Sequence, residues 1–199
     1  MIQYLPTELP DVWHLLPEKY GDARGYFTEL LRFPEFYDRM PCQPFVQENE
    51  SLSSRGVLRG MHLQRGDAAQ AKLVRAVYGR VLDVVVDLRY SSPTFGRYVA
   101  VVLDGEQKNM LFVPRGFAHG FLTLSEQALF NYKVDNVYAP NTEISISPFD
   151  DEIAIPWVQL AIQHASPLET PLSREQFILS DKDIKGISLS DFRQQNINH

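Results

Sequence analysis

Cysteine is almost absent from this chain of 199 residues, which contains only Cys42. A disulfide framework within the chain is therefore excluded, and a reducing cytoplasm is the expected location. No apolar run approaches the roughly 18 residues of a membrane-spanning helix, so a membrane is not an expected partner. The stretch 1–22 also lacks the basic start and long apolar core of a secretory signal peptide.

Basic residues are fewer than acidic ones, 19 against 25, which gives a net charge of −6. Such a chain does not present a broad basic face, so nucleic acid is not an expected partner. A local cluster of arginine and lysine side chains can still hold the phosphates of a small anionic ligand. Repeats, low-complexity tracts and linkers are missing too, so residues 1–199 are expected to form one domain with a substantial core.

The middle of the chain is rich in β-branched residues. Two such runs, separated by a glycine turn, occupy residues 71–90. In the second run Leu82, Val84, Val86 and Leu88 share one face, because side chains along a strand alternate between its two faces. Short strands at regular spacing predict a sandwich or barrel. Further strands are expected at 97–103, 110–114, 118–124 and 128–134.

Helical signals are weak in this sequence. Short helices are expected at residues 33–40, "FPEFYDRM", and at residues 188–195, "SLSDFRQQ". The segment from Val158 to Gln176 is polar and contains proline, so it is expected to be an irregular surface excursion.

Two of the five histidines lie among apolar strand residues. They are His62 in "GVLRGMHLQ" and His119 in "VPRGFAHGF". A lone histidine in such a place is more often a hydrogen-bonded core residue than a functional one. The other three, His14, His164 and His199, have polar or terminal neighbours and are expected at the surface.

The spacing P-x-G-x-x-H from Pro114 to His119 resembles the second sequence motif of the cupins, a jelly-roll superfamily. The first cupin motif would supply H-x-H and then a glutamate as metal ligands. Here the matching stretch is "HLQ" at 62–64, and no glutamate follows before Gly79. Zinc and iron sites usually need three protein ligands, so two imidazoles are too few. We therefore expect an all-β jelly roll without a metal, in which His62 is free to act as a base.

Arg59, His62 and Lys72 would line one cavity if their strands pack as in a jelly roll, with Tyr132 and Tyr138 added by a later hairpin. Taken singly, either tyrosine is better explained as a half-buried strand residue. Together, an imidazole, an ammonium and a phenol are the groups that move protons at a carbon next to a carbonyl. An imidazole with a pKa near ~6.5 cannot ionise such a carbon unaided, so Lys72 would matter as much as His62.

Six stretches, in the right order, resemble the dTDP-4-dehydrorhamnose 3,5-epimerase family. They extend from about Asp22 to Asp183 and comprise "GDARGYFTE", "VQENESLSSRGVLRGMH", "QAKLVRAVYGRVLDVVVDLRYSSPTFG", "VPRGFAHGFLTLS", "NYKVDNVYAP" and "ILSDKD". The resemblance implies a cupin-type jelly roll with short peripheral helices. It also implies a homodimeric enzyme that needs no metal or organic cofactor and acts on a dTDP-linked keto sugar.

The resemblance assigns catalytic roles to four residues. His62 matches the general base of the family, and Asp183 matches the partner that orients the imidazole and stabilises its charged form. Tyr132 matches the acid that protonates from the opposite face. Lys72 matches the residue on the C4 oxygen of the keto sugar.

Further positions match residues that hold the substrate. Three of them belong to "RGYFTE", which in the family reaches the nucleotide of the neighbouring subunit. The full set is Arg24, Phe27, Glu29, Gln47, Asn49, Arg59, Lys72, His119, Tyr138, Glu143 and Lys182.

The sequence departs from the usual family pattern in three places. Met61 and Leu63 flank the base where leucine and an aromatic residue are usual. A tryptophan often precedes the acidic turn near residue 150, and here it is missing. The stretch between Trp157 and "LSDKD" is longer than expected. These departures affect substrate detail more than reaction type.

Three functions remain open on the sequence. The first is epimerisation at C3 and C5 of dTDP-4-dehydro-6-deoxy-D-glucose to dTDP-4-dehydro-L-rhamnose. The second is epimerisation at C3 or C5 alone, on a related nucleotide keto sugar. The third is a non-enzymatic module that binds a sugar or a metal. The presence of both His62 and Tyr132 favours the first, because inversion at C5 needs a base and an acid on opposite faces.

Overall fold

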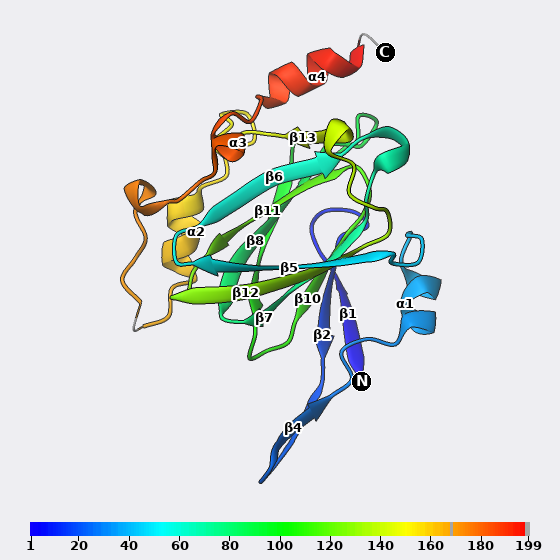
Figure 1. Cartoon of the computed structure of the whole chain (residues 1–199), viewed down its shortest axis with the longest axis vertical. Helices are drawn as coiled ribbons and strands as arrows, with labels where there is room; N and C mark the ends of the chain where they lie inside the picture. Colours follow the sequence, from blue (N-terminus) through cyan, green and yellow to red (C-terminus); the bar gives the residue numbers. More distant parts are fainter. Residues whose placement is uncertain (168, 198–199) are drawn as a thin grey trace.

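Two antiparallel β-sheets form the body of the molecule in the computed structural model, which describes residues 1–167 and 169–197 (Figure 1). The six-stranded sheet has the order β1-β2-β10-β7-β12-β5, and the five-stranded sheet has the order β13-β6-β11-β8-β9. From β5 to β8 and again from β9 to β13, successive strands alternate between the two sheets, and the predicted jelly-roll class is confirmed. The first sheet comprises β1 (Ile2–Pro6), β2 (Trp13–Pro17), β10 (Met110–Val113), β7 (Lys72–Tyr78), β12 (Gln127–Val134) and β5 (Gln47–Ser54). The second comprises β13 (Glu143–Ser145), β6 (Leu58–Gln64), β11 (Phe117–Thr123), β8 (Arg80–Asp87) and β9 (Tyr98–Asp104).

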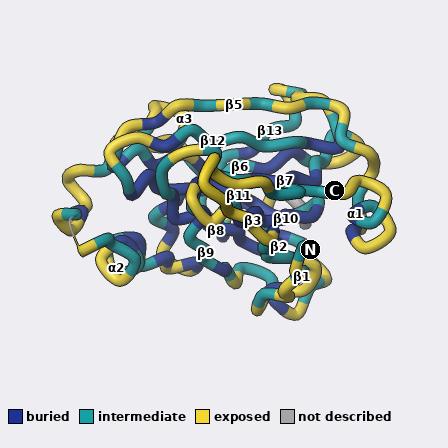
Figure 2. The backbone as a smooth tube through the Cα atoms, turned by 90° about the horizontal axis from the view of Figure 1, so that it is seen from below, coloured by how far each residue is buried: buried dark blue, intermediate teal, exposed yellow. Residues whose placement is uncertain are grey.

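The five-stranded sheet is buried on both faces. Along β8, Leu82 and Val84 face one core cluster, as the alternation predicted, and Val81 and Val85 face a second. The second cluster fills the space between the two sheets. There Phe121 of β11 stacks on Phe130 of β12, with ring centroids 4.2 Å apart. Buried backbone accordingly runs through β8 and β11, whereas β5 carries many exposed residues (Figure 2).

Short helices lie at the periphery, as predicted. They are α1 (Phe33–Arg39), α2 (Trp157–Gln163), α3 (Asp181–Ile184) and α4 (Leu189–Ile197), with 3-10 turns η1 (Gly66–Ala68), η2 (Pro140–Thr142) and η3 (Arg174–Gln176). Within the described residues, none of these helices is long and apolar enough to cross a membrane.

The predicted irregular excursion at 158–176 is wrong at its start, because α2 occupies that part. Trp157 and Ala161 lie one helical turn apart and are both buried in the core cluster outside the five-stranded sheet. Further along, Leu172 is buried in the same cluster, and Glu169 pairs with Arg80 of β8 at 3.2 Å. The segment is thus anchored to the sheet at several points.

The surface prediction for the remaining histidines is only partly right. His14 is half-buried, and its Nε2 lies 2.9 Å from the side-chain nitrogen of Asn109. His164 is also half-buried, and its carbonyl oxygen accepts a hydrogen bond from Arg80. His199 lies outside the described residues.

A two-stranded hairpin, β3 (Lys19–Asp22) and β4 (Gly25–Thr28), projects from the body below the six-stranded sheet (Figure 1). Nearly all of its residues are exposed, including Tyr26 and Phe27. Exposed aromatic side chains on a projecting arm are unusual for a surface that faces only water.

Candidate active site

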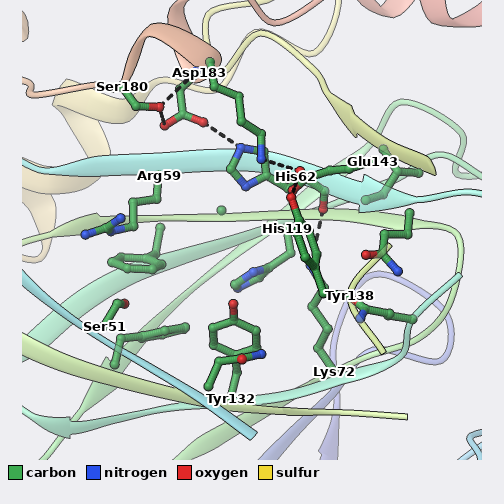
Figure 3. A pocket seen from close by; sticks show the side chains of 18 of the residues that line it. Ser51, Arg59, His62, Lys72, His119, Tyr132, Tyr138, Glu143, Ser180 and Asp183 are labelled. Atoms are coloured by element: carbon green, nitrogen blue, oxygen red, sulfur yellow. Dashed lines mark hydrogen bonds and ion pairs between the residues drawn. The ribbon is translucent and has the colours of Figure 1, made fainter. Parts of the chain in front are cut away.

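A cavity of about 480 Å³ opens between the two sheets. The six-stranded sheet contributes Lys72 and Tyr132 to its wall, and the five-stranded sheet contributes His62 and His119. Figure 3 shows His62 and Tyr132 on opposite sides of this cavity, with His119 between them. The predicted residues that line it are Gln47, Asn49, Arg59, His62, Lys72, His119, Tyr132, Tyr138, Glu143, Lys182 and Asp183.

A bulge in β6 places Arg59 and His62 on the same side of the sheet. Three residues apart, they would face opposite sides of a regular strand. The register against β11 shifts between them, however, because Arg59 is opposite Phe121 and His62 is opposite His119. The bulge includes Gly60, whose φ of +118° favours glycine, and a Cβ there would lie 2.5 Å from the Cα of Gly120.

His62 and Asp183 form a tight pair. The Nε2 of His62 lies 2.6 Å from the Oδ1 of Asp183, and the hydroxyl of Ser180 donates to the other carboxylate oxygen at 2.7 Å. Burial acts to raise the pKa of Asp183, but the hydrogen bonds from His62 and Ser180 outweigh it and lower the pKa. Asp183 is therefore ionised, and its bond to Nε2 fixes the orientation of the imidazole and leaves Nδ1 outside this pair.

The sequence prediction missed Ser180, which caps helix α3. Its Oγ accepts a hydrogen bond from the backbone N–H of Asp183 while its own proton goes to the Asp183 carboxylate. The pattern S-x-x-D that could have revealed it is present in "SDKD". The cap thus positions the carboxylate that in turn holds the imidazole of His62.

Lys72 is buried at the side of the cavity, with 9% of its surface exposed. Its Nζ lies 3.5 Å from the carbonyl oxygen of His62. Burial lowers the pKa of Lys72 to about 8, and attraction to Glu143 and Asp83 opposes that effect. An ammonium that is partly stripped of water is a strong electrostatic partner for an oxyanion.

Tyr132 lies across the cavity from His62 and is half-buried (Figure 3). Burial and then the charge of Glu143 raise the pKa of Tyr132. The phenol therefore keeps its proton at neutral pH, which suits an acid.

The rim of the cavity carries a charged network centred on Glu143. Lys182 lies 2.5 Å from its carboxylate, and the hydroxyl of Tyr138 donates to it at 2.8 Å. Burial acts to raise the pKa of Glu143, but the hydrogen bonds from Lys182 and Tyr138 outweigh it and lower the pKa. Tyr138 itself is exposed, so its ring is accessible to a ligand in the cavity.

Polar side chains also line the open side of the cavity. Arg59 donates from Nε to the hydroxyl of Ser53 at 3.0 Å, and its guanidinium is otherwise exposed. The side-chain amide of Gln47 donates to Asn49 at 2.8 Å. Gln47 and Asn49 are two residues apart on β5, so the two-residue period of the strand brings them to one face.

A second histidine–aspartate pair, also missed in part, lies behind the first. The Nε2 of His119 is 2.8 Å from the Oδ2 of Asp83, which is fully buried. The sequence prediction named His119 but not Asp83, because an aspartate within the apolar run "VLDVVV" gives no signal of its own. The ring of His119 stacks on Phe130.

Three predicted residues lie away from the cavity of their own chain. Arg24 on the hairpin pairs with Asp22, and Phe27 is 69% exposed. Glu29 follows the hairpin and pairs with Arg32 at 3.0 Å. None of the three lines the cavity. Across residues 1–167 and 169–197, no three His, Cys, Asp or Glu side chains gather as a metal-binding group.

Known proteins resemble this chain over most of its length. The family model for dTDP-4-dehydrorhamnose 3,5-epimerase matches residues 6–191. The dTDP-4-dehydrorhamnose 3,5-epimerase of Salmonella typhimurium is 49% identical over 158 residues, which cover 79% of this chain and 86% of that protein. A dTDP-4-dehydrorhamnose 3-epimerase of Streptomyces niveus is 34% identical over 184 residues, which cover 92% of this chain and 86% of that protein.

Solved structures agree with the sequence comparison. The crystal structure of dTDP-6-deoxy-D-glucose-3,5-epimerase from Legionella pneumophila, in complex with dTDP-4-keto-L-rhamnose, superposes with a TM-score of 0.84 and 39% identity. The match covers 96% of this chain and 94% of that one. Together with the family model, these matches show that the chain belongs to the dTDP-4-dehydrorhamnose 3,5-epimerase family.

Proposed function

We propose that this protein epimerises C3 and C5 of dTDP-4-dehydro-6-deoxy-D-glucose and releases dTDP-4-dehydro-L-rhamnose. The observation that carries the proposal is one cavity with a base and an acid on opposite walls, His62 with its carboxylate partner and Tyr132. The relatives of this chain include epimerases that bear this name, which supports the substrate class.

The reaction begins with removal of the C5 proton by His62. That carbon lies next to the C4 ketone, so the electron pair moves onto the C4 oxygen and forms an enolate. The ammonium of Lys72 holds this negative charge, while Asp183 stabilises the imidazolium that forms. Tyr132 then delivers a proton to the other face of C5, and the enolate collapses back to the ketone. The same sequence of removal and return inverts C3, after His62 and the tyrosine have exchanged their protons with water.

The nucleotide is held at the open end of the cavity. Arg59 and Lys182 are the cations there, and guanidinium groups suit bidentate contacts to phosphate. Tyr138 offers an exposed ring for the base. Arg24, Phe27 and Glu29 complete the site of a neighbouring copy in a homodimer, which accounts for a projecting hairpin that does not line its own cavity. The enzyme works in the cytoplasm, as its single free cysteine supports.

Solvent deuterium tests the proposal. Substrate incubated in D2O should take up deuterium at both C3 and C5, read by NMR. His62→Ala should reduce exchange at both carbons by at least about 10²–10⁴-fold, the usual contribution of a general base. His164→Ala is the matched control, because His164 lies outside the cavity, and it should exchange at the wild-type rate.

Tyr132→Phe separates the two proton transfers. Its base and lysine remain, so C5 should still exchange, but inversion at C5 should fail because the far-face acid is gone. Wild-type exchange in His62→Ala would disprove the mechanism. Label at one carbon only, in the wild type, would instead make the protein a mono-epimerase, the second candidate that the similarity to the 3-epimerase of Streptomyces niveus supports.

A further inference from the structure

Strand β8 carries two fully buried aspartates that differ sharply in their hydrogen bonds. The carboxylate of Asp87 accepts from Arg89, Ser92 and Thr94, in each case at 3.0 Å or less. The carboxylate of Asp83 bonds only to His119, through Oδ2. Its Oδ1 is buried and has no hydrogen-bond partner within the part of the chain that the structure describes.

An unpartnered carboxylate oxygen weakens the fold. Leaving a buried acceptor unsatisfied costs about 1–3 kcal/mol, and more if the group is charged. Asp87 is explained as a structural residue, because its donors compensate its burial. Asp83 is not explained in this way, so its presence calls for a reason outside stability.

Asp83 lies directly behind the proposed active site. It is opposite Phe121 in the register of β8 with β11, and its partner His119 lines the cavity. Its negative charge also acts to raise the pKa of Lys72, which is buried at the first position of β7. The other charged groups that act on Lys72 are Glu143 on β13 and Lys182 on α3, and these two are already paired with each other.

We propose that Asp83 is a positioning residue for the epimerisation, which holds the His119 proton on Nε2 and keeps Lys72 in its ammonium form. The inference rests on the proposed function. An ionised carboxylate only accepts hydrogen bonds, so with Asp83 ionised the nitrogen of His119 that faces it carries the proton and Nδ1 is left for the sugar. A buried ammonium tends to lose its proton, and a nearby negative charge counteracts that tendency.

The two groups stabilise each other's charge. Burial raises the pKa of Asp83, and His119 and Lys72 oppose this increase without cancelling it. Burial lowers the pKa of Lys72, and Glu143 and Asp83 oppose this decrease. With Glu143 engaged at the rim by Lys182 and Tyr138, Asp83 is the carboxylate that remains for Lys72 on the inner side.

The experiment compares the pH dependence of deuterium exchange in wild type, Asp83→Asn and Asp87→Asn. Asparagine keeps the size and an acceptor for His119, so the first variant removes chiefly the charge. The rate of exchange in this variant should begin to fall about one pH unit lower than in the wild type, on the alkaline side of the pH profile. Exchange at pH 8 should therefore be about fivefold slower than in the wild type. Asp87→Asn should melt at a lower temperature but keep the wild-type limb. An unmoved limb in folded Asp83→Asn overturns the inference.

A second measurement needs no variant and no turnover. The ¹⁵N NMR shifts of His119 in the wild-type protein should report a proton on Nε2, and a neutral Nδ1–H form would overturn the inference even if Asp83→Asn fails to fold. The two proposals also fail separately. Exchange in the wild type with an unmoved limb in Asp83→Asn refutes only the role of Asp83, whereas no exchange in the wild type refutes the proposed function on which that role depends.

Discussion

Function and stability oppose each other at the scale of a single residue, and Lys72 is the clearest case. Its ammonium is almost fully buried, and burial brings the pKa down from 10.5 to about 8. The unfolded chain therefore binds more protons than the folded protein between these pH values. Because stability rises with pH wherever the unfolded state binds more protons, the free energy of unfolding increases as pH rises across this window.

Activity and stability should consequently diverge above neutral pH. Deuterium exchange should fall as pH rises through about 8, because the ammonium that holds the enolate loses its proton. The free energy of unfolding should increase over the same range, by up to about 3 kcal/mol. Parallel measurements of exchange and of urea unfolding between pH 7 and about 10 check this. A joint fall of both quantities would contradict it.

Lys72→Met should separate the two roles at neutral pH. The variant removes the buried charge and keeps the side-chain length, so we expect a more stable protein, by roughly 1–3 kcal/mol, with almost no exchange activity. Thermal melting and deuterium exchange provide the two readouts. Lys185→Met is the control, since Lys185 is exposed and its loss should change stability by less than about 0.5 kcal/mol.

Arg59 should matter for affinity rather than for the fold. Its guanidinium is exposed at the mouth of the cavity. Besides the hydrogen bond to Ser53, it makes a weak contact of 3.5 Å with the carbonyl oxygen of Leu52. Arg59→Ala should weaken dTDP binding at least about tenfold, the usual worth of a charge-assisted hydrogen bond. Calorimetry measures this, with Arg193→Ala as control because Arg193 pairs with Glu152 away from the cavity. Unchanged affinity would remove Arg59 from the site.

At the scale of elements, the same capping pattern occurs twice near the C-terminus. Ser180 caps α3 and bonds to Asp183, and Ser188 precedes α4 and bonds to Asp191 at 2.7 Å. Only the first cap holds a carboxylate that lines the cavity. Serine-to-alanine substitution can therefore be compared at the two caps, and only the substitution at Ser180 should affect the reaction.

Ser180→Ala should lower the free energy of unfolding by about 0.5–2 kcal/mol and reduce exchange severalfold. It also removes a donor from Asp183, so the pKa of this carboxyl should move up and activity should be lost at a higher pH on acidification. Ser188→Ala should cost similar stability and leave the acid limb in place. Equal pH profiles for the two variants would show that Ser180 is only a helix cap.

Sequence patterns predicted the strands between residues 71 and 134 and the helices α1 and α4, but not strands β1 to β5, strand β13 or helix α2, and the reason is physical. Alternation along β8 and turn residues between the runs are local, so they are visible in the chain. Helix α2 has no side-chain cap and begins after Pro156, so the local sequence contains no capping signal that would predict a helix there. It forms because Trp157 and Ala161 fit a core built by distant residues. Asp83 was missed for the same reason, since its partner His119 is brought to it only by the pairing of β8 with β11.

At the scale of the whole molecule, the hairpin β3–β4 is the part that a single chain does not explain. The motif "RGYFTE" identified its residues. A single sequence contains no pattern that tells whether these residues contact the cavity of their own chain or that of a neighbouring chain. The projecting hairpin with its exposed Phe27 fits service to a neighbouring copy. A stable homodimer is expected, and sedimentation velocity should find one across a wide concentration range.

Complementation between two inactive variants tests the shared site. One variant carries His62→Ala and a native hairpin, and the other carries Arg24→Ala with Phe27→Ala and a native cavity. In a mixed dimer one site contains a native cavity and a native hairpin from different chains. Coexpression should therefore restore about a quarter of wild-type activity per site if chains pair at random. If mixed dimers are verified by mass spectrometry and activity does not recover, the hairpin does not contribute to the cavity of the neighbouring chain.

The stacked pair Phe121 and Phe130 joins the two sheets from which the base and the acid project. Since His62 belongs to one sheet and Tyr132 to the other, no local backbone geometry sets the gap between proton acceptor and proton donor. The distance between these two side chains depends instead on the spacing of the two sheets, which is set by the volume of the rings packed between them. Protein interiors are close-packed, and a displacement of about 1 Å in a reacting group can cost 10²-fold in rate. The two phenylalanines are in this sense a spacer, so a change of side-chain volume at these positions should change the rate of proton transfer while His62 and Tyr132 stay the same.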